Sequence, residues 1–244
     1  MDLDFIRRAE KVTSFNLTTK DFQSLDYKQE IQHLFNKHFF PEFNLDSTID
    51  NVDMVKMNRL ISELKQEQGG QMLAKLHSYN LKGVGPGEAT LYFLCNKAQL
   101  GGGSSAGVDI LVGTDKYEVK AVKVSSTTPR TASDFKLGGT VPLTDIMVRL
   151  NKLREKTSVG GSKTEMSGSV MMAMQRAAAF EYKEIEQMFA ETAYNNYFKN
   201  HEIIFINNAA GPRLGYIEAI KQVEKKDIMI ERVTSGTIKP KVKL

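Results

Sequence analysis

The first third of the chain carries apolar residues three and four positions apart, which predicts helices between residue 21 and about residue 81. The spacing is carried by Tyr27, Ile31, Leu34 and Phe35, and then by Val55, Leu60 and Leu64. Pro41 breaks the first stretch, because proline cannot donate to the helix ladder. Residues 51–68 have Asp53 near their start and a polar face, as an amphipathic helix does. We expect these helices to form an accessory layer on a later sheet.

Residues 83–100 contain a second helix-forming stretch, GVGPGEATLYFLCNKAQL. Pro86 suits an early helical position and Glu88 falls in the first turn, after which the apolar run continues to about Gln99. This pattern favours a buried helix over a strand. Residues 101–107 are rich in glycine and serine, which predicts a flexible connector. They lack the lysine and hydroxyl ending of a P-loop, so a phosphate-binding loop is not expected.

Two short β-branched runs, VDILVG and KYEVKAVKV, are separated by a turn-like GTD and predict a β-hairpin. A polar loop is expected from residue 125 to residue 142, and a helix from about Leu143 to Lys156. That helix has Ile146, Leu150 and Leu153 on one face. The polar loop is long enough to suggest a function.

The last third begins with a glycine- and serine-rich stretch, residues 158–169, which leads into a long helix over residues 171–198. Met171, Met172 and Met174 are expected to pack this helix. Later strands are predicted at HEIIFIN and, more weakly, over residues 214–220 and 227–233, before a basic tail, KPKVKL.

This order of elements predicts an α/β or α+β fold with a central mixed β-sheet flanked by helices. We expect an N-terminal helical accessory region over residues 1–82, a core over residues 83–210, and C-terminal strands with a basic tail over residues 211–244. The three regions are expected to form one compact unit.

Composition narrows the class of protein. With 244 residues, 41% of them hydrophobic, the chain can bury a core of its own. No apolar run reaches the length of a membrane span and the N-terminus lacks a signal-peptide pattern, so we expect a cytoplasmic protein without membrane contact. The single cysteine, Cys95, lies in an apolar run and is expected to be a buried structural thiol. The net charge of +4 permits a nucleic-acid partner without requiring one.

The predicted hairpin places charged residues together. Residues two apart on a strand share a face, so Glu118 and Lys120 point the same way. A two-residue turn centred on Gly113–Thr114 would put Asp109 opposite Glu118, and a turn one residue later would put it opposite Lys120. Two carboxylates and an ammonium on one half-buried face favour a bound hard cation, and Mg²⁺ takes such oxygen ligands.

Asp109 followed by Glu118-Val119-Lys120 on the next strand resembles the signature of the PD-(D/E)xK nuclease superfamily. The resemblance covers residues 83–124, and residues 203–207 suit a later core strand. It implies a restriction-endonuclease-like core. Two departures are that Val108 stands where the signature has proline, and that the gap to Glu118 is short.

The resemblance also implies roles for these residues. Asp109 and Glu118 would be catalytic metal ligands, Glu88 on the preceding helix would support them, and Lys120 would orient the water or neutralise charge. The expected enzyme is a Mg²⁺-dependent DNA endonuclease in which Mn²⁺ substitutes. Lys123, Arg130 and Lys136 are candidate DNA contacts.

Other interpretations stay open. The charged strand face can be an ordinary solvated surface, and Glu88 can simply be stabilised by the helix dipole. A non-catalytic nucleic-acid-binding or structural protein, such as a phage-particle component, is the alternative of a different class. Among enzymes, a dimeric restriction-type endonuclease and a structure- or end-specific repair nuclease are not separated. The four histidines show no zinc-hydrolase spacing.

Overall fold

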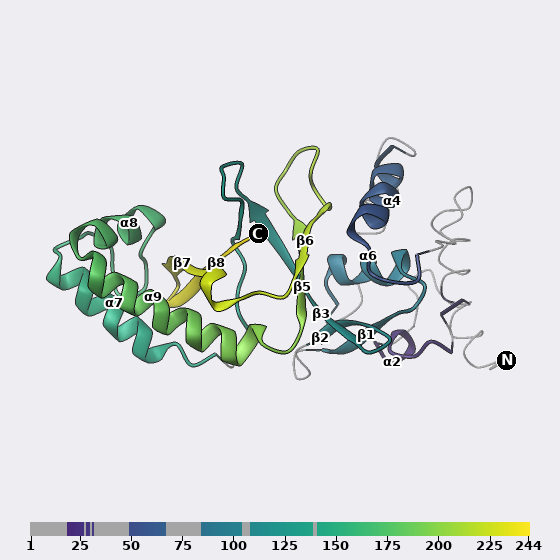
Figure 1. Cartoon of the computed structure of the whole chain (residues 1–244), viewed down its shortest axis with the longest axis horizontal. Helices are drawn as coiled ribbons and strands as arrows, with labels where there is room; N and C mark the ends of the chain where they lie inside the picture. Colours follow the sequence, from purple (N-terminus) through teal and green to yellow (C-terminus); the bar gives the residue numbers. More distant parts are fainter. Residues whose placement is uncertain are drawn as a thin grey trace. The chain divides into compact units, whose positions relative to one another are not determined.

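The computed structural model describes residues 19–26, 28–29, 31, 49–66, 84–103, 108–138 and 141–244. Over these residues the chain is an α+β protein with eight strands and six α-helices (Figure 1). Every strand pair whose register is defined is antiparallel, so the sheet is mostly antiparallel rather than evenly mixed. The α+β class is thus confirmed, and the restriction-endonuclease-like arrangement stays a prediction. Within the described residues, no helix combines the length and apolarity needed to cross a membrane.

The chain divides into two compact units. The first contains the described residues up to Val119 together with Gly215–Ile217, and the second contains Lys120–Leu214 and Glu218–Leu244. The division runs through one strand, whereas the sequence predicted a single unit with boundaries after residues 82 and 210. The physical reason is that the two ends of this strand pair with different neighbours.

Among its described residues, the first unit holds three helices, the two strands of the predicted hairpin and a further strand that pairs with them. Their bounds are α2 Thr19–Phe22, α4 Met54–Gln66, α6 Pro86–Leu94, β1 Ala98–Gly103, β2 Val108–Val112 and the start of β3 Asp115–Val124. The amphipathic helix predicted over residues 51–68 is confirmed as α4. It buries Met57, Ile61 and Leu64, and the Asp53 carboxylate accepts a hydrogen bond from the Lys56 backbone N–H at 2.9 Å. The parts of the predicted helical stretch, residues 21 to about 81, that fall in residues 32–48 and from residue 67 onward lie outside the described residues.

The amide of Asn58 on α4 ties residue 217 into the first unit. Its Nδ2 donates to the Ile217 carbonyl at 2.7 Å, and its Oδ1 accepts from the Ile217 N–H at 2.8 Å. The paired bonds satisfy both backbone groups of Ile217. A short segment distant in sequence therefore belongs with the N-terminal helices.

The helix predicted to reach Gln99 is shorter than expected, because α6 ends at Leu94. Ala98–Gly103 instead forms β1, whose Leu100 pairs with Ile110 of β2. A Cβ on Gly101 would stand 1.8 Å from the carbonyl oxygen of Val108, so glycine permits the close approach of the two strands. The predicted flexible connector is therefore wrong for residues 101–103, and residues 104–107 are not described.

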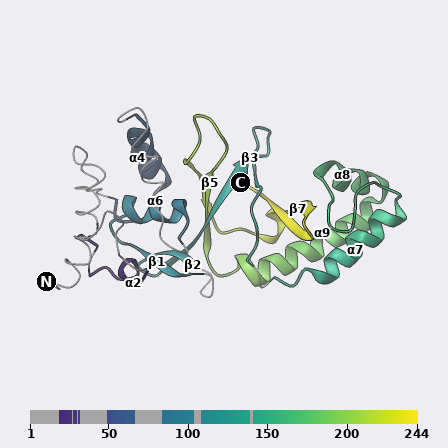
Figure 2. The ribbon, with the colours of Figure 1, turned by 180° about the vertical axis from the view of Figure 1, so that it is seen from behind.

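The second unit packs three helices beside the remaining strands (Figures 1 and 2). The helices are α7 Thr144–Lys156, α8 Gly168–Ala177 and α9 Ala179–Ala193, continued by the π-helical turn η2 Tyr194–Phe198, and a short 3₁₀ turn η3 spans Lys225–Asp227. The strands are the end of β3, then β4 Thr131–Ser133, β5 Glu202–Asn207, β6 Ile217–Lys221, β7 Ile228–Thr234 and β8 Thr237–Lys243. The pairing order is β3-β4-β8-β7, while β5 pairs with β3 and β6.

Several predictions for this half are confirmed. The helix expected from about Leu143 is α7, with Ile146, Leu150 and Leu153 buried as predicted. The strand HEIIFIN is β5, and the two weaker candidates are β6 and β7. Buried Met171 and Met174 pack in the core, whereas Met172 is exposed.

Three predictions are corrected. The polar loop contains β4, and the basic tail is β8, which is paired along β7 from a turn at Ser235–Gly236. The long helix is two helices, because the backbone leaves helical geometry at Ala178, with φ −146° and ψ 64°. This change of direction lets α8 and α9 both contact β7.

Candidate functional site

The register of the β2–β3 hairpin fixes the position of the candidate carboxylates. Ile110 pairs with Tyr117 and Val112 with Asp115, so the turn is centred on Gly113–Thr114. Continuing this register by one residue places Asp109 opposite Glu118, the first of the two registers predicted. Residues opposite each other on antiparallel strands have their side chains on the same face.

Asp109 is held by a direct hydrogen bond to the partner strand. Its Oδ2 accepts the backbone N–H of Val119 at 2.8 Å. The last residue pair of the β2–β3 ladder is Ile110 with Tyr117. Just beyond it, the Asp109 side-chain oxygen, rather than a backbone carbonyl, accepts the N–H of Val119. This hydrogen bond orients the carboxylate.

Glu118 is a buried carboxyl in the middle of the hairpin strand. It is 7% exposed, and its strand neighbours Tyr117 and Val119 are buried as well. Asp109 and Lys120 are both half-buried. A carboxylate in such a poorly solvated position interacts more strongly with neighbouring charges than one in water does.

Glu88 lies in the first turn of α6, as predicted, where the helix dipole stabilises a carboxylate. Its Oε1 is 3.0 Å from the point that a Cβ on Gly85 would occupy, so the side chain folds back over the helix start. The described ranges hold no group of three or more His, Cys, Asp or Glu side chains placed to bind a metal. The structure therefore does not bring Glu88 together with Asp109 and Glu118 as a three-ligand set.

Lys120 follows Glu118 by two residues on β3 and so lies on the same face of that strand. Its ammonium is 5.6 Å from the ring centroid of Tyr197, within the range of a cation–π interaction. Tyr197 belongs to the π-helical turn η2 and packs edge-on against Phe198, with ring centroids 4.8 Å apart. Sequence reasoning missed Tyr197, because nothing in the run YNNYF marks a contact with a lysine 77 positions earlier.

The three candidate DNA contacts have different surroundings. The Lys123 ammonium pairs with Asp134 at 2.8 Å, and Arg130 contacts the Glu218 carboxylate. The hydrogen bond from Lys123, with further help from Arg232, outweighs desolvation and lowers the pKa of Asp134. Lys136 is exposed.

A second carboxylate site, in the second unit, was not predicted. Glu218 on β6 is buried and accepts hydrogen bonds from Arg130, Arg213 and Asn207. Desolvation raises the pKa of this carboxyl, but the donated hydrogen bonds from Arg213, Asn207 and Arg130 outweigh it and the pKa falls below its usual value. In the sequence, Glu218 is one polar position in an alternating strand, and nothing identifies its partners.

Cys95 is buried and free, as predicted, and ends α6 with an extended backbone. Its thiol donates to the Asp50 carbonyl at 3.4 Å. Burial raises the pKa of Cys95, chiefly through desolvation. A thiol with a raised pKa is a poor nucleophile at neutral pH, so Cys95 suits a structural role.

Comparisons of this chain with models of protein families, with curated proteins and with solved structures found no match. The resemblance to the nuclease superfamily therefore stays a prediction from the residues of 83–124.

Proposed function

We propose that this protein is a metal-dependent deoxyribonuclease that hydrolyses phosphodiester bonds. The observation that carries the proposal is the hairpin register, which sets the oriented carboxylate of Asp109 opposite the buried carboxylate of Glu118. Two adjacent carboxylates repel each other, and a hard divalent cation with oxygen ligands relieves this repulsion. The donor set therefore fits Mg²⁺, with Mn²⁺ as a substitute.

The chain's own residues have distinct roles in this proposal. Asp109 is oriented by the Val119 N–H, and Glu118 presents its charge in a poorly solvated position where electrostatic interactions are strong. A bound Mg²⁺ would polarise the phosphate and lower the pKa of a coordinated water. The Lys120 ammonium would donate to a phosphate oxygen and stabilise the negative charge that grows there during attack. Glu88 is not needed as a ligand.

The test is cleavage of supercoiled, linear and single-stranded DNA with Mg²⁺, with Mn²⁺ and with EDTA. Asp109→Ala should abolish metal-dependent cleavage, and Lys120→Ala should slow it by at least about a hundredfold, the usual effect of removing a charge-stabilising group. Asp115→Asn and Lys116→Ala are matched controls, because both residues are exposed on the same strand, β3. These controls should cut like the wild type.

Thermal unfolding of each variant shows whether it remains folded. If folded Asp109→Ala and Lys120→Ala proteins cut as fast as their controls, the proposed active site is wrong. Product mapping would then separate the open subclasses: a dimer cutting a defined palindrome indicates a restriction-type enzyme, and end- or branch-dependent cutting indicates a repair-type enzyme.

A second candidate is a non-catalytic nucleic-acid-binding or structural protein with the same hairpin. It is favoured by one observation, that no three-ligand metal group occurs in the part of the chain that the structure describes. Wild-type protein that binds DNA but cuts none of the three forms with either metal would support this candidate and contradict the nuclease.

A further inference from the structure

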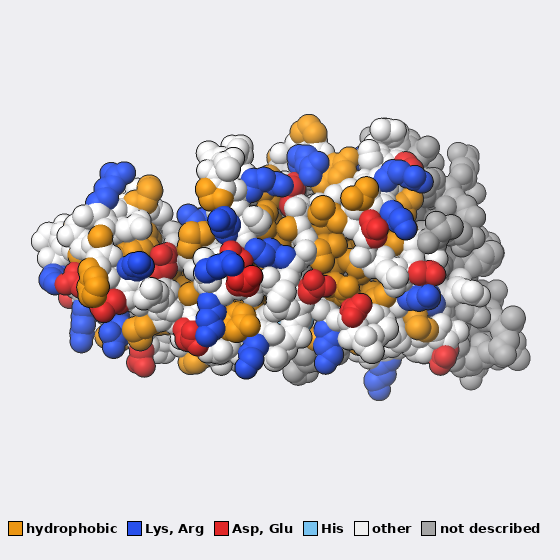
Figure 3. All heavy atoms as spheres, in the orientation of Figure 1, with side chains coloured by type: hydrophobic (Ala, Val, Ile, Leu, Met, Phe, Trp, Pro, Cys, Tyr) orange, Lys and Arg blue, Asp and Glu red, His pale blue; other side chains and the backbone are white. Residues whose placement is uncertain are grey.

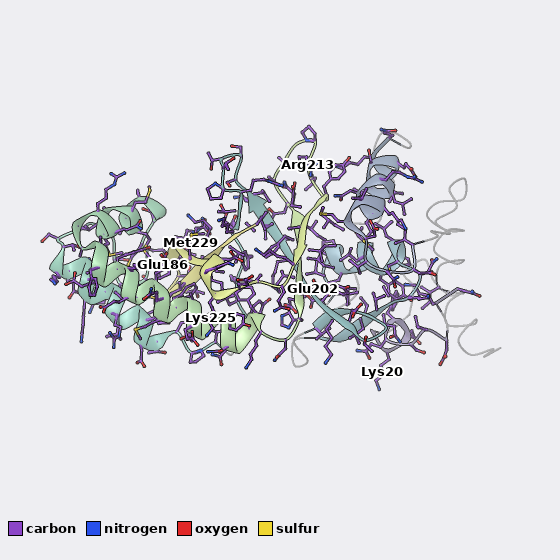
Figure 4. All side chains as sticks on the ribbon, in the orientation of Figure 1. Lys20, Glu186, Glu202, Arg213, Lys225 and Met229 are labelled. Carbon is purple, nitrogen blue, oxygen red and sulfur yellow. The ribbon has the colours of Figure 1, made fainter. Side chains whose placement is uncertain are left out.

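The carboxylate of Glu218 is shared by two arginines from different loops of the second unit. Arg130 precedes β4, and Arg213 lies in the loop between β5 and β6, where Figure 4 labels it. Arg213 donates through Nε to Oε1 at 3.2 Å and through Nη2 to Oε2 at 3.1 Å. Arg130 donates to Oε2 through its Nη2. One carboxylate therefore orients two guanidinium groups.

Glu218 is buried while both arginines face solvent. The Glu218 side chain is 2% exposed, against 49% for Arg130 and 59% for Arg213. Asn207 Nδ2 donates to Oε1 at 2.8 Å, and the Oδ1 of the same amide accepts the Ala209 N–H at 2.9 Å. The Glu218 carboxylate is thus also held by the amide of Asn207, the last residue of β5, from which the loop that carries Arg213 begins.

The two arginines carry more positive charge than Glu218 neutralises. The three groups sum to one positive charge. A guanidinium has five N–H donors, and Arg213 uses two of them on Glu218 and Arg130 one. A single bidentate arginine would already neutralise the carboxylate. The second arginine therefore leaves one net positive charge on two guanidinium groups that are about half exposed, in a region where Figure 3 shows Lys and Arg side chains around the β5–β6 loop.

We propose that Arg130 and Arg213 form a binding site for a backbone phosphate of DNA, held in position by Glu218. Phosphate oxygens match the planar guanidinium fork, and side chains that are already ordered lose little entropy when they bind. Glu218 and Asn207 are positioning residues, because they act through the arginines. The proposal rests on DNA as the substrate in the proposed function, but it does not require cleavage.

The experiment measures the affinity of labelled duplex DNA by fluorescence anisotropy in EDTA, where metal-dependent cutting cannot occur. Arg130→Gln and Arg213→Gln should each weaken binding roughly five- to tenfold at about 0.1 M salt, and each should lower the slope of log affinity against log salt by about one, because one phosphate contact is lost. Arg149→Gln is the matched control, since Arg149 is an exposed arginine on α7 and the change in charge is identical. It should bind like the wild type.

Removing one arginine leaves a buried carboxylate with fewer partners and can unfold the protein. The double variant Glu218→Gln with Arg213→Gln avoids this problem, because it keeps the net charge and removes the buried carboxylate. This double variant should remain folded and should bind DNA more weakly than the wild type does. Wild-type affinity in this variant, or equal losses in Arg149→Gln and Arg213→Gln, would overturn the site.

The two proposals fail in different ways. If DNA binding depends on the arginines but no DNA is cleaved, the proposed nuclease activity is wrong and the proposed phosphate site stands. If cleavage depends on Asp109 but both arginine variants bind DNA as tightly as the wild type, the proposed phosphate site is wrong and the proposed nuclease activity stands. Wild-type protein that binds no DNA contradicts both.

Discussion

The carboxylate of Glu186 on α9 accepts a hydrogen bond from the backbone N–H of Ile230 on β7, 3.2 Å away. The register between β7 and β8 shifts between Ile230 and Arg232, so the ladder is irregular at this point. The helix thus supplies an acceptor for a strand N–H beside the irregularity. Desolvation raises the pKa of Glu186, although the bond from Ile230 and the charge of Lys241 oppose this rise.

Glu186→Gln should remove a pH dependence of stability. Because the pKa of Glu186 is raised in the folded protein, this carboxyl contributes stability that is fully present below its ordinary value of about 4.5 and is lost as pH rises through the folded pKa. Glutamine keeps an oxygen acceptor for Ile230 and carries no charge. The wild type should therefore lose stability relative to the variant as pH rises from about 4.5.

Urea unfolding at stepped pH measures this difference in the free energy of unfolding. Glu184→Gln is the control, because Glu184 is exposed on the same helix, and its curve should run parallel to that of the wild type. A Glu186→Gln curve parallel to the wild type would show that folding does not raise the pKa of Glu186.

Asp109→Asn and Asp109→Ala should separate the structural role of Asp109 from its proposed chemical role. Asparagine keeps an oxygen for the Val119 N–H, so it should unfold within about 0.5 kcal/mol of the wild type, whereas alanine should lose about 1 kcal/mol with the hydrogen bond. Both should abolish metal-dependent cleavage, because both lose the carboxylate. Urea unfolding and the cleavage assay give the two readouts, and an asparagine variant with wild-type activity would contradict the ligand role.

Tyr197→Leu should slow cleavage about two- to fivefold, since a cation–π contact at a partly exposed site contributes about 0.5–1 kcal/mol. Tyr197→Phe keeps the ring and should cut like the wild type. The loss should appear in kcat, because Tyr197 positions Lys120. In a Lys120→Ala background, Tyr197→Leu should have no further effect. Equal losses in both backgrounds would show that Tyr197 acts independently of Lys120.

Gly101→Ala should destabilise the first unit by about 1–3 kcal/mol, because the new Cβ would collide with the backbone carbonyl of Val108 and the strands must move apart. Gly160→Ala is the control, since no atom lies within 4 Å of a Cβ there, and it should leave stability unchanged. Equal unfolding midpoints for the two variants would mean that β1 and β2 do not approach this closely.

By itself, the sequence determined the elements whose residues carry a local period. The alternation around Gly113–Thr114 was enough for the β2–β3 hairpin, and the three-and-four spacing of Ile146, Leu150 and Leu153 was enough for α7. In such stretches the apolar pattern and the turn residues indicate the same secondary structure. For Asp109 the tight turn and strand parity left two registers, opposite Glu118 or opposite Lys120, and the strand pairing decided for Glu118.

Tertiary structure alone decided the features that depend on distant partners. Ala98–Gly103 is a strand because β2 pairs with it, although its glycines locally favour a loop, and the lysine-rich C-terminus is β8 because it pairs with β7 and β4. The same holds for Arg213 beside Glu218 and for Tyr197 beside Lys120. Local propensity amounts to less than about 1 kcal/mol per residue, so pairing and burial across the chain override it.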